Sequence, residues 1–231
     1  MSKLTLLLLS VLAATPTLAA QVTVEVTNAT HGIYFTPLLV TAHDASTHLF
    51  QPGMAASANL QAMAEGGDIA GLLTDLAGED ADTVADPAAG LLAPGADTMT
   101  VLDTTVTANT HLSIVAMLLP TNDGFVGMDA LKIPSAPGTY MYPLVGFDAG
   151  TEANDELITG GGAPGVAGIP ADPGGNDGTG GTGVAAADTN ATVHVHRGTL
   201  GDTDPAGGTS DLDSRVHRWL NPVALLRLTV Q

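Results

Sequence analysis

The chain has 231 residues, of which 24 are acidic and six are basic, so its formal net charge is −18 at pH 7. A charge of this sign and size opposes contact with nucleic acid and with anionic lipid, which are therefore not expected as partners. The chain also has no cysteine. This excludes disulfide bonds, thiol catalysis and cysteine-bound iron–sulfur clusters, so the fold must rest on its hydrophobic core, on bound ions or on both.

The first 20 residues have the layout of a secretory signal peptide. Lys3 is followed by an apolar run over residues 4–14, and small residues precede a cleavage point near Ala19 or Ala20. An uncleaved membrane anchor is the alternative, although a spanning helix needs about 20 apolar residues and no later segment reaches that length. We therefore expect an exported protein, secreted or periplasmic and without membrane insertion, whose residues 21–231 form one domain.

Hydrophobic alternation predicts strands over most of the remaining chain. In QVTVEVTN (21–28), three valines fall on one face and polar side chains on the other, as in a half-buried strand. Seven or eight such strands predict an all-β fold, a β-sandwich. Six further β-rich runs are separated by Gly, Pro, Asn and Asp clusters typical of turns: 33–43, 98–106, 110–120, 139–147, 191–198 and 221–231.

One stretch between the second and third predicted strands has helical spacing instead. Apolar residues recur every three or four positions over 60–64 and again over 69–76. This pattern predicts two short helices, separated by the Gly-Gly pair at 66–67. Asp68 is the predicted N-cap of the second helix, and Gly78 is its predicted end.

Two segments have the composition of surface loops. Residues 78–97 are acidic and interrupted by Pro and Gly, and residues 160–183 contain eleven glycines in 24 positions. Because glycines are costly to order, the second segment is expected to be a mobile loop that buries no core and is dispensable for folding.

The sequence FDAGTEANDE (147–156) gathers four carboxylates around one glycine, in a chain where only 13% of residues are charged. Together with TNDGFVGMDAL (121–131), it resembles the paired signature of the spondin N-terminal (F-spondin) domain family of animal matrix proteins and bacterial secreted proteins. Similarity to the bacterial members extends over FTPLLVTAHD (35–44), LFQPGMAASANLQAMAEGGD (49–68) and NPVALLRLTV (221–230).

The resemblance implies an antiparallel β-sandwich related to C2 domains, with one calcium ion held by three acidic residues. On this sequence the three positions fall on Asp123, Asp148 and Glu152, the last in place of an aspartate. Ca²⁺ takes about six to eight oxygen ligands, which an acidic turn can supply from side chains and free carbonyls. Gly150 would let that turn curl through left-handed backbone angles. The alternative is that these acids only solvate an exposed loop.

The sequence VHVH (193–196) places His194 and His196 on the same face of a predicted strand. Such a pair can hold zinc or copper if a third ligand converges. The alternative is an ordinary strand with its valines inward and its histidines facing solvent. The candidates for the third ligand are His31, His43, His111 and His217.

Three functions remain open. The resemblance implies a calcium-binding module for extracellular recognition or adhesion, with an unknown extracellular protein or glycan as its partner. A metal-dependent enzyme that uses the histidine face and a purely structural exported protein are the alternatives. The sequence lacks the Gly-x-Ser-x-Gly, His-Glu-x-x-His and phosphate-binding glycine–lysine motifs, so we expect a protein that is not an enzyme.

Overall fold

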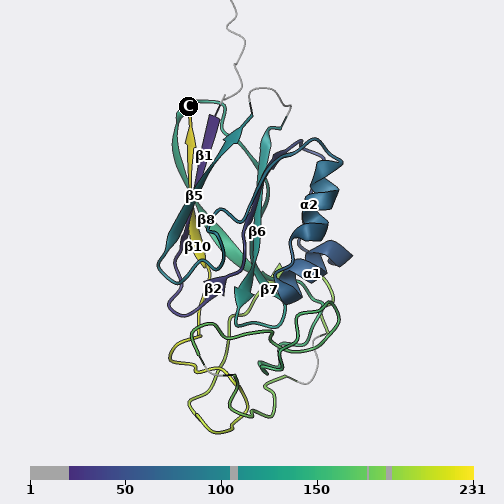
Figure 1. The fold of residues 1–231 in the computed structure, drawn as a ribbon, viewed down its shortest axis with the longest axis vertical. Coiled ribbons are helices and arrows are strands. Elements are labelled where there is room, and N and C mark those ends of the chain that lie inside the picture. Colours follow the sequence, from purple (N-terminus) through teal and green to yellow (C-terminus); the bar gives the residue numbers. More distant parts are fainter. Residues whose placement is uncertain (1–20, 105–108, 176, 186–188) are drawn as a thin grey trace, which may run out of the picture.

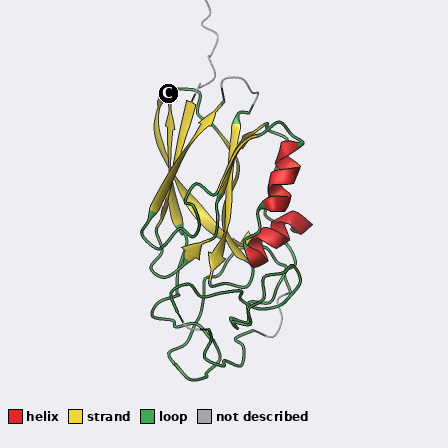
Figure 2. Ribbon diagram, in the orientation of Figure 1, coloured by secondary structure: helices red, strands yellow, loops and turns green. Residues whose placement is uncertain are grey.

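The computed structural model describes residues 21–104, 109–175, 177–185 and 189–231. The segment that carries the signal-peptide prediction lies outside the described residues, and so does the end of the strand predicted over 98–106. The elements of the described chain (Figures 1 and 2) are β1 (Gln21–Asn28), β2 (Tyr34–Phe35), β3 (Leu39–His43), α1 (Ala58–Gly66), α2 (Ala70–Ala77), β4 (Asp82–Ala85), β5 (Asp97–Asp103), β6 (His111–Leu119), β7 (Gly124–Lys132), β8 (Gly138–Asp148), β9 (His194–Val195) and β10 (Ala224–Val230).

The longer strands follow one antiparallel path in the order β4-β3-β6-β7-β8-β10-β1-β5, while the two-residue strands β2 and β9 pair with β6 and β8. Strand β8 belongs to both layers, because Gly138–Leu144 pair with β10 whereas Val145–Asp148 pair with β7. The fold is therefore a two-layer β-sandwich with two short helices, which confirms the all-β prediction (Figure 2).

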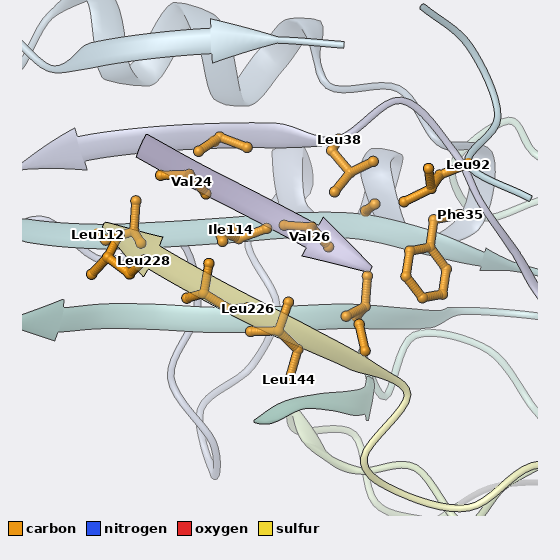
Figure 3. Close-up of a cluster of buried hydrophobic side chains, with 14 of the residues drawn as sticks. Val24, Val26, Phe35, Leu38, Leu92, Leu112, Ile114, Leu144, Leu226 and Leu228 are labelled. Atoms are coloured by element: carbon orange, nitrogen blue, oxygen red, sulfur yellow. The ribbon is translucent and has the colours of Figure 1, made fainter. Parts of the chain in front are cut away.

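The main core lies between the two layers. The alternation in β1 buries Val22, Val24 and Val26 as predicted, and β1 pairs with β10 on one side and with β5 on the other. Figure 3 shows Val24 and Val26 beside Leu226 of β10 and Ile114 of β6, so both layers contribute to one cluster.

A second core lies between the β6 layer and the helices. Leu60 and Met63 of α1 and Leu72 of α2 pack against Val115 and Met117 of β6. Strand β6 is thus covered on both faces, which explains why its sequence is a continuous apolar run rather than an alternation.

The two helices form where the sequence predicts them. Ser57 Oγ accepts the Leu60 N–H at 3.1 Å and caps the start of α1. The helix ends at Gly66, and the C-cap residue Gly67 has the left-handed conformation, φ 72°. The N-cap position of α2 is Ile69, one residue later than predicted, although Asp68 Oδ1 accepts the Ala70 N–H at 2.9 Å.

Two strand predictions need correction, and two strands of the structure were not predicted. The run 33–43 is divided by Thr36–Leu38 into β2 and β3, and the run 191–198 retains only the two residues of β9. Strand β7 lies in the motif that was recognised by resemblance rather than by alternation, and β4 lies in the segment predicted as the loop 78–97.

Long irregular segments gather at the end of the sandwich opposite the C-terminus (Figure 1). The described residues of 160–183 contain no helix or strand, as predicted. The prediction that this segment buries no core is wrong, because Ile169 is fully buried and forms a parallel bridge with Ile158.

No helix in the described chain is long and apolar enough to cross a membrane.

Candidate metal centre

Two of the three predicted ligands meet at the loop end of the sandwich. Asp123 directly precedes β7 and Asp148 is the last residue of β8, and the two strands pair with Gly124 opposite Asp148. Both aspartates are fully buried, at 0% and 1% exposure. The pairing of β7 with β8 therefore brings the two carboxylates together, away from water, at the open end of the strand pair.

Only one of the two carboxylate oxygens of Asp123 accepts hydrogen bonds. Its Oδ2 accepts the Thr151 N–H at 2.8 Å and the Glu152 N–H at 3.1 Å, whereas its buried Oδ1 has no hydrogen-bond partner. Burial, together with the neighbouring Asp148 charge, raises the pKa of the Asp123 carboxyl to about 7. A positive charge between these two carboxylates would relieve both effects.

Asp148 is held by the turn that follows it. Its Oδ1 accepts the Gly150 N–H at 2.8 Å, and its Oδ2 accepts the Asn154 Nδ2–H at 2.7 Å. Gly150 has φ 72°, as the sequence predicts, and a Cβ there would lie 2.7 Å from Thr192 N. Both backbone angle and packing therefore require glycine at this position.

Glu152 contributes to the site through its backbone. Its N–H binds Asp123, while its side-chain Oε2 accepts the Gly168 N–H at 3.0 Å. The other oxygen, Oε1, is buried without a hydrogen-bond partner. Burial, with the charges of Glu65 and Asp155 as further causes, raises the pKa of Glu152 to about 7. In the described part of the chain, no three His, Asp or Glu side chains are grouped closely enough to hold a metal ion by themselves.

The remaining acids of the turn organise distant loops. Asp155 Oδ1 accepts the Asn122 Nδ2–H at 2.9 Å. Glu156 Oε1 accepts the Leu200 N–H at 2.6 Å, and its Oε2 accepts the Gly201 N–H at 2.8 Å and the Ser210 hydroxyl at 2.7 Å. Glu156 is only 5% exposed, so the alternative of a merely solvated loop is wrong for this turn. The sequence carries no local signal for these contacts, because the partners of Glu156 lie 44 to 54 residues away.

The histidine pair lies beside the same site, and the expectation that its valines point inward holds for one of the two: Val193 is buried at 1% exposure, whereas Val195 faces outward. His196 is 5% exposed, whereas Val195 is 59% exposed. Because Gly198 N–H donates to His196 Nδ1, the ring proton lies on Nε2 and is donated to Asn154 Oδ1 at 3.0 Å. Asn154 in turn donates to Asp148, so this chain of hydrogen bonds fixes the carboxylate.

His194 lies beside the same carboxylate, with its Nε2 3.7 Å from Asp148 Oδ2. The proposed third zinc or copper ligand is not found in the described residues, where no group of three potential ligands is formed. His43, for example, is fully buried in β3, and its Nε2 lies 2.7 Å from Ser113 Oγ. Both residues of this serine–histidine pair are inaccessible to a substrate.

In the presence of a chelator, the wild-type protein is expected to melt at a higher temperature at about pH 5.5 than at about pH 8. The folded pKa of Asp123, about 7, is above its ordinary value of 3.8, so the folded state retains a proton that the unfolded state has lost. Stability therefore falls as the pH rises through this window. Differential scanning calorimetry of wild type and Asp123→Asn measures the effect. Equal pH slopes for the two proteins would contradict it.

A comparison with protein families finds a match to this chain. The Spondin_N family model matches residues 27–156, more than half of the chain, and includes all three predicted ligands. No curated protein matches the chain. The histidine pair and the loops after residue 156 lie beyond the match. With its antiparallel sandwich and this match, the chain belongs to the spondin N-terminal domain family.

Proposed function

We propose that this protein is an exported, calcium-stabilised module for recognition or adhesion outside the cell. The single observation that carries the calcium assignment is the unpartnered, fully buried Oδ1 of Asp123 next to Asp148. Two carboxylates brought together in a buried site repel one another, and a cation between them removes that cost. The export proposal depends on the layout of residues 1–20.

The chemistry of the site favours calcium over softer metals. Asp123 and Asp148 offer hard carboxylate oxygens, and the adjoining turn is irregular backbone whose carbonyls can also serve as ligands. Calcium accepts such carbonyls and water alongside carboxylates, so it does not require three side-chain ligands. Glu152 is the third proposed ligand through Oε1, its oxygen without a hydrogen-bond partner, and binding through this atom requires the side chain to move closer to the two aspartates than in this structure.

The position of the proposed calcium site, at the ends of β7 and β8, indicates how a bound ion would affect the structure. Asp123 precedes β7, Asp148 ends β8, and the turn after Asp148 contacts the loops at this end of the sandwich. A bound ion would hold these loops in place in a chain without disulfides. Loops presented by a rigid sandwich are the usual place for recognition.

The non-enzymatic assignment has two supports. Spondin_N is a family of non-enzymatic domains. The serine–histidine pair of Ser113 and His43 is fully buried in the core and cannot contact a substrate. An extracellular protein or glycan remains the proposed partner.

Calcium is expected to raise the melting temperature of the wild-type protein by several degrees. Calcium at a hundredfold excess over its dissociation constant adds about 2.7 kcal/mol to the free energy of unfolding. For a chain of this size that is roughly 5–10 °C. Isothermal and scanning calorimetry with calcium, magnesium and chelator measure the effect. Magnesium should substitute poorly, because it prefers a smaller octahedral site.

Three variants test the ligand set. Asp148→Asn should bind no calcium and melt close to the calcium-free temperature, whereas Glu79→Gln, an exposed acid at the end of α2, should behave as wild type. Glu152→Gln should weaken binding if its Oε1 is a ligand. The assignment fails if wild type shows no heat of binding at millimolar calcium, or if Asp148→Asn binds as tightly as wild type.

A further inference from the structure

A second polar site lies outside the family match, among the loops that follow the acidic turn. A pocket of about 210 Å³ is lined by residues of two segments, 172–179 and 202–217. Both segments belong to the irregular end of the molecule (Figure 1). None of the lining residues is among the proposed calcium ligands.

Two buried side chains of this pocket carry atoms that make no hydrogen bond. Asp172 and His217 have side chains that are 3% and 5% exposed, and Asp172 Oδ1 lies 3.3 Å from His217 Nε2. Neither atom makes a hydrogen bond, and His217 Nδ1 also lacks one. Of the six buried side-chain atoms without a hydrogen-bond partner in the described chain, three belong to this pair. A buried polar atom without a hydrogen bond destabilises the fold, and a ligand in the pocket would offset this cost.

The other carboxylates of the pocket already have hydrogen-bond or ion-pair partners within the protein. Asp211 accepts the Ile158, Thr179 and Gly181 N–H groups, at 2.8–2.9 Å. Asp202 Oδ2 accepts the backbone N–H groups of residues 209 and 210. Asp213 pairs with Arg215 at 2.6 Å. Asp204 is exposed, and its Oδ1 accepts the Ala206 N–H at 3.0 Å. The buried groups left for a ligand are therefore those of Asp172 and His217.

The charge and shape of the pocket define the ligand class. Five aspartates and one arginine line it, which gives a formal charge of −4 with His217 neutral. Negative walls of this kind concentrate cations. Pro205, Leu212 and Val216 supply apolar contacts beside the charged groups. The volume admits a small molecule, and the described residues offer no set of three ligands for a metal.

We infer that this pocket binds a small organic cation with a primary ammonium group on a short aliphatic chain. The ammonium group donates hydrogen bonds to Asp172 Oδ1 and to the unprotonated ring nitrogen of His217. Its carbon chain contacts the apolar wall. An ammonium group has three N–H donors and no acceptor, which suits a site whose free groups are mainly acceptors.

The test uses butylammonium as the probe and 1-butanol as a neutral compound of the same shape. Binding to the full-length protein is followed by calorimetry and by the NMR signals of the His217 imidazole, with and without calcium. Butylammonium should bind saturably and shift the His217 signals in both conditions, while 1-butanol should bind at least tenfold more weakly. Binding that persists in chelator separates this site from the proposed calcium site.

Two variants that each remove one negative charge identify the carboxylate that contacts the probe. Asp172→Asn should weaken butylammonium binding at least tenfold, whereas Asp204→Asn, which removes the same charge from the exposed rim, should weaken it less than about threefold. If Asp172→Asn does not fold, His217→Gln tests the second contact and should also weaken binding at least tenfold. The inference is overturned by no saturable binding at tens of millimolar probe, by equal binding of 1-butanol, or by equal effects of the two aspartate variants.

Discussion

Replacement of Glu156 by alanine is expected to lower the free energy of unfolding by about 3–5 kcal/mol. The side chain is 5% exposed and accepts hydrogen bonds from Leu200 N–H, Gly201 N–H and the Ser210 hydroxyl. Hydrogen bonds to a charged group contribute about 1.5–3 kcal/mol each, and they are not additive. Alanine would leave three donors without their acceptor, two of them in the backbone of a loop that has no regular secondary structure.

Chemical denaturation of Glu156→Ala, Glu156→Gln and Glu156→Gly separates the contributions. Glutamine retains one acceptor oxygen and should lose less than alanine. Glu156 has φ 58°, a left-handed conformation that glycine adopts without strain, so glycine should be about 1 kcal/mol more stable than alanine. Glu79→Ala, at an exposed position, should change the stability by less than about 0.5 kcal/mol. A loss below about 1 kcal/mol for Glu156→Ala would contradict this account.

Replacement of residues 160–183 by a short Gly-Ser linker is expected to destabilise the fold strongly, the reverse of the expectation from composition. The segment contains the fully buried Ile169, and its Gly165 and Gly168 N–H groups bind the carboxylates of Glu65 and Glu152. Ile→Ala substitutions in cores cost about 2–5 kcal/mol, so Ile169→Ala alone should lower the melting temperature by roughly 5–15 °C.

The matched control lies three residues away. Val166→Ala removes a side chain that is 50% exposed and should change the free energy of unfolding by less than about 0.5 kcal/mol. Scanning calorimetry of the two variants and of the linker replacement gives the comparison. A linker variant that melts at the wild-type temperature would show that the segment does not contribute to the fold, whatever its contacts.

Local patterns predict the elements whose burial follows a simple period. Strand β1 alternates between buried and half-buried positions along its length, and α1 ends at the glycine pair that breaks the helical spacing. Hydrophobic alternation does not predict strand β7, because it contains Gly124 and Gly127, which weaken a strand pattern. A Cβ on Gly127 would lie 2.7 Å from the Phe50 ring, so packing in three dimensions selects this residue.

The family resemblance predicts the two aspartates of the site, whereas no local pattern predicts the contacts that depend on distant loops. Asp123 and Asp148 are brought together by the pairing of β7 with β8. The direction of the Glu152 side chain depends on Gly168, which lies 16 residues away in a segment without regular structure. The inward orientation of His196 depends on Trp219, whose ring centroid lies 5.0 Å from its own. The local sequence around Glu152 does not predict the first contact, and the alternation of residues 191–198 does not predict the second.

The carboxylates that organise the loops contact backbone N–H groups, and this has an evolutionary consequence. Glu156 binds the N–H of Leu200, whose side chain is 46% exposed, and Asp202 binds the N–H of Thr209, which is also exposed. Every residue except proline offers the same donor, so the side chains at these positions can diversify while the loop keeps its path. The acids at 156 and 202 can thus hold the same loop path whichever side chains the surface positions carry.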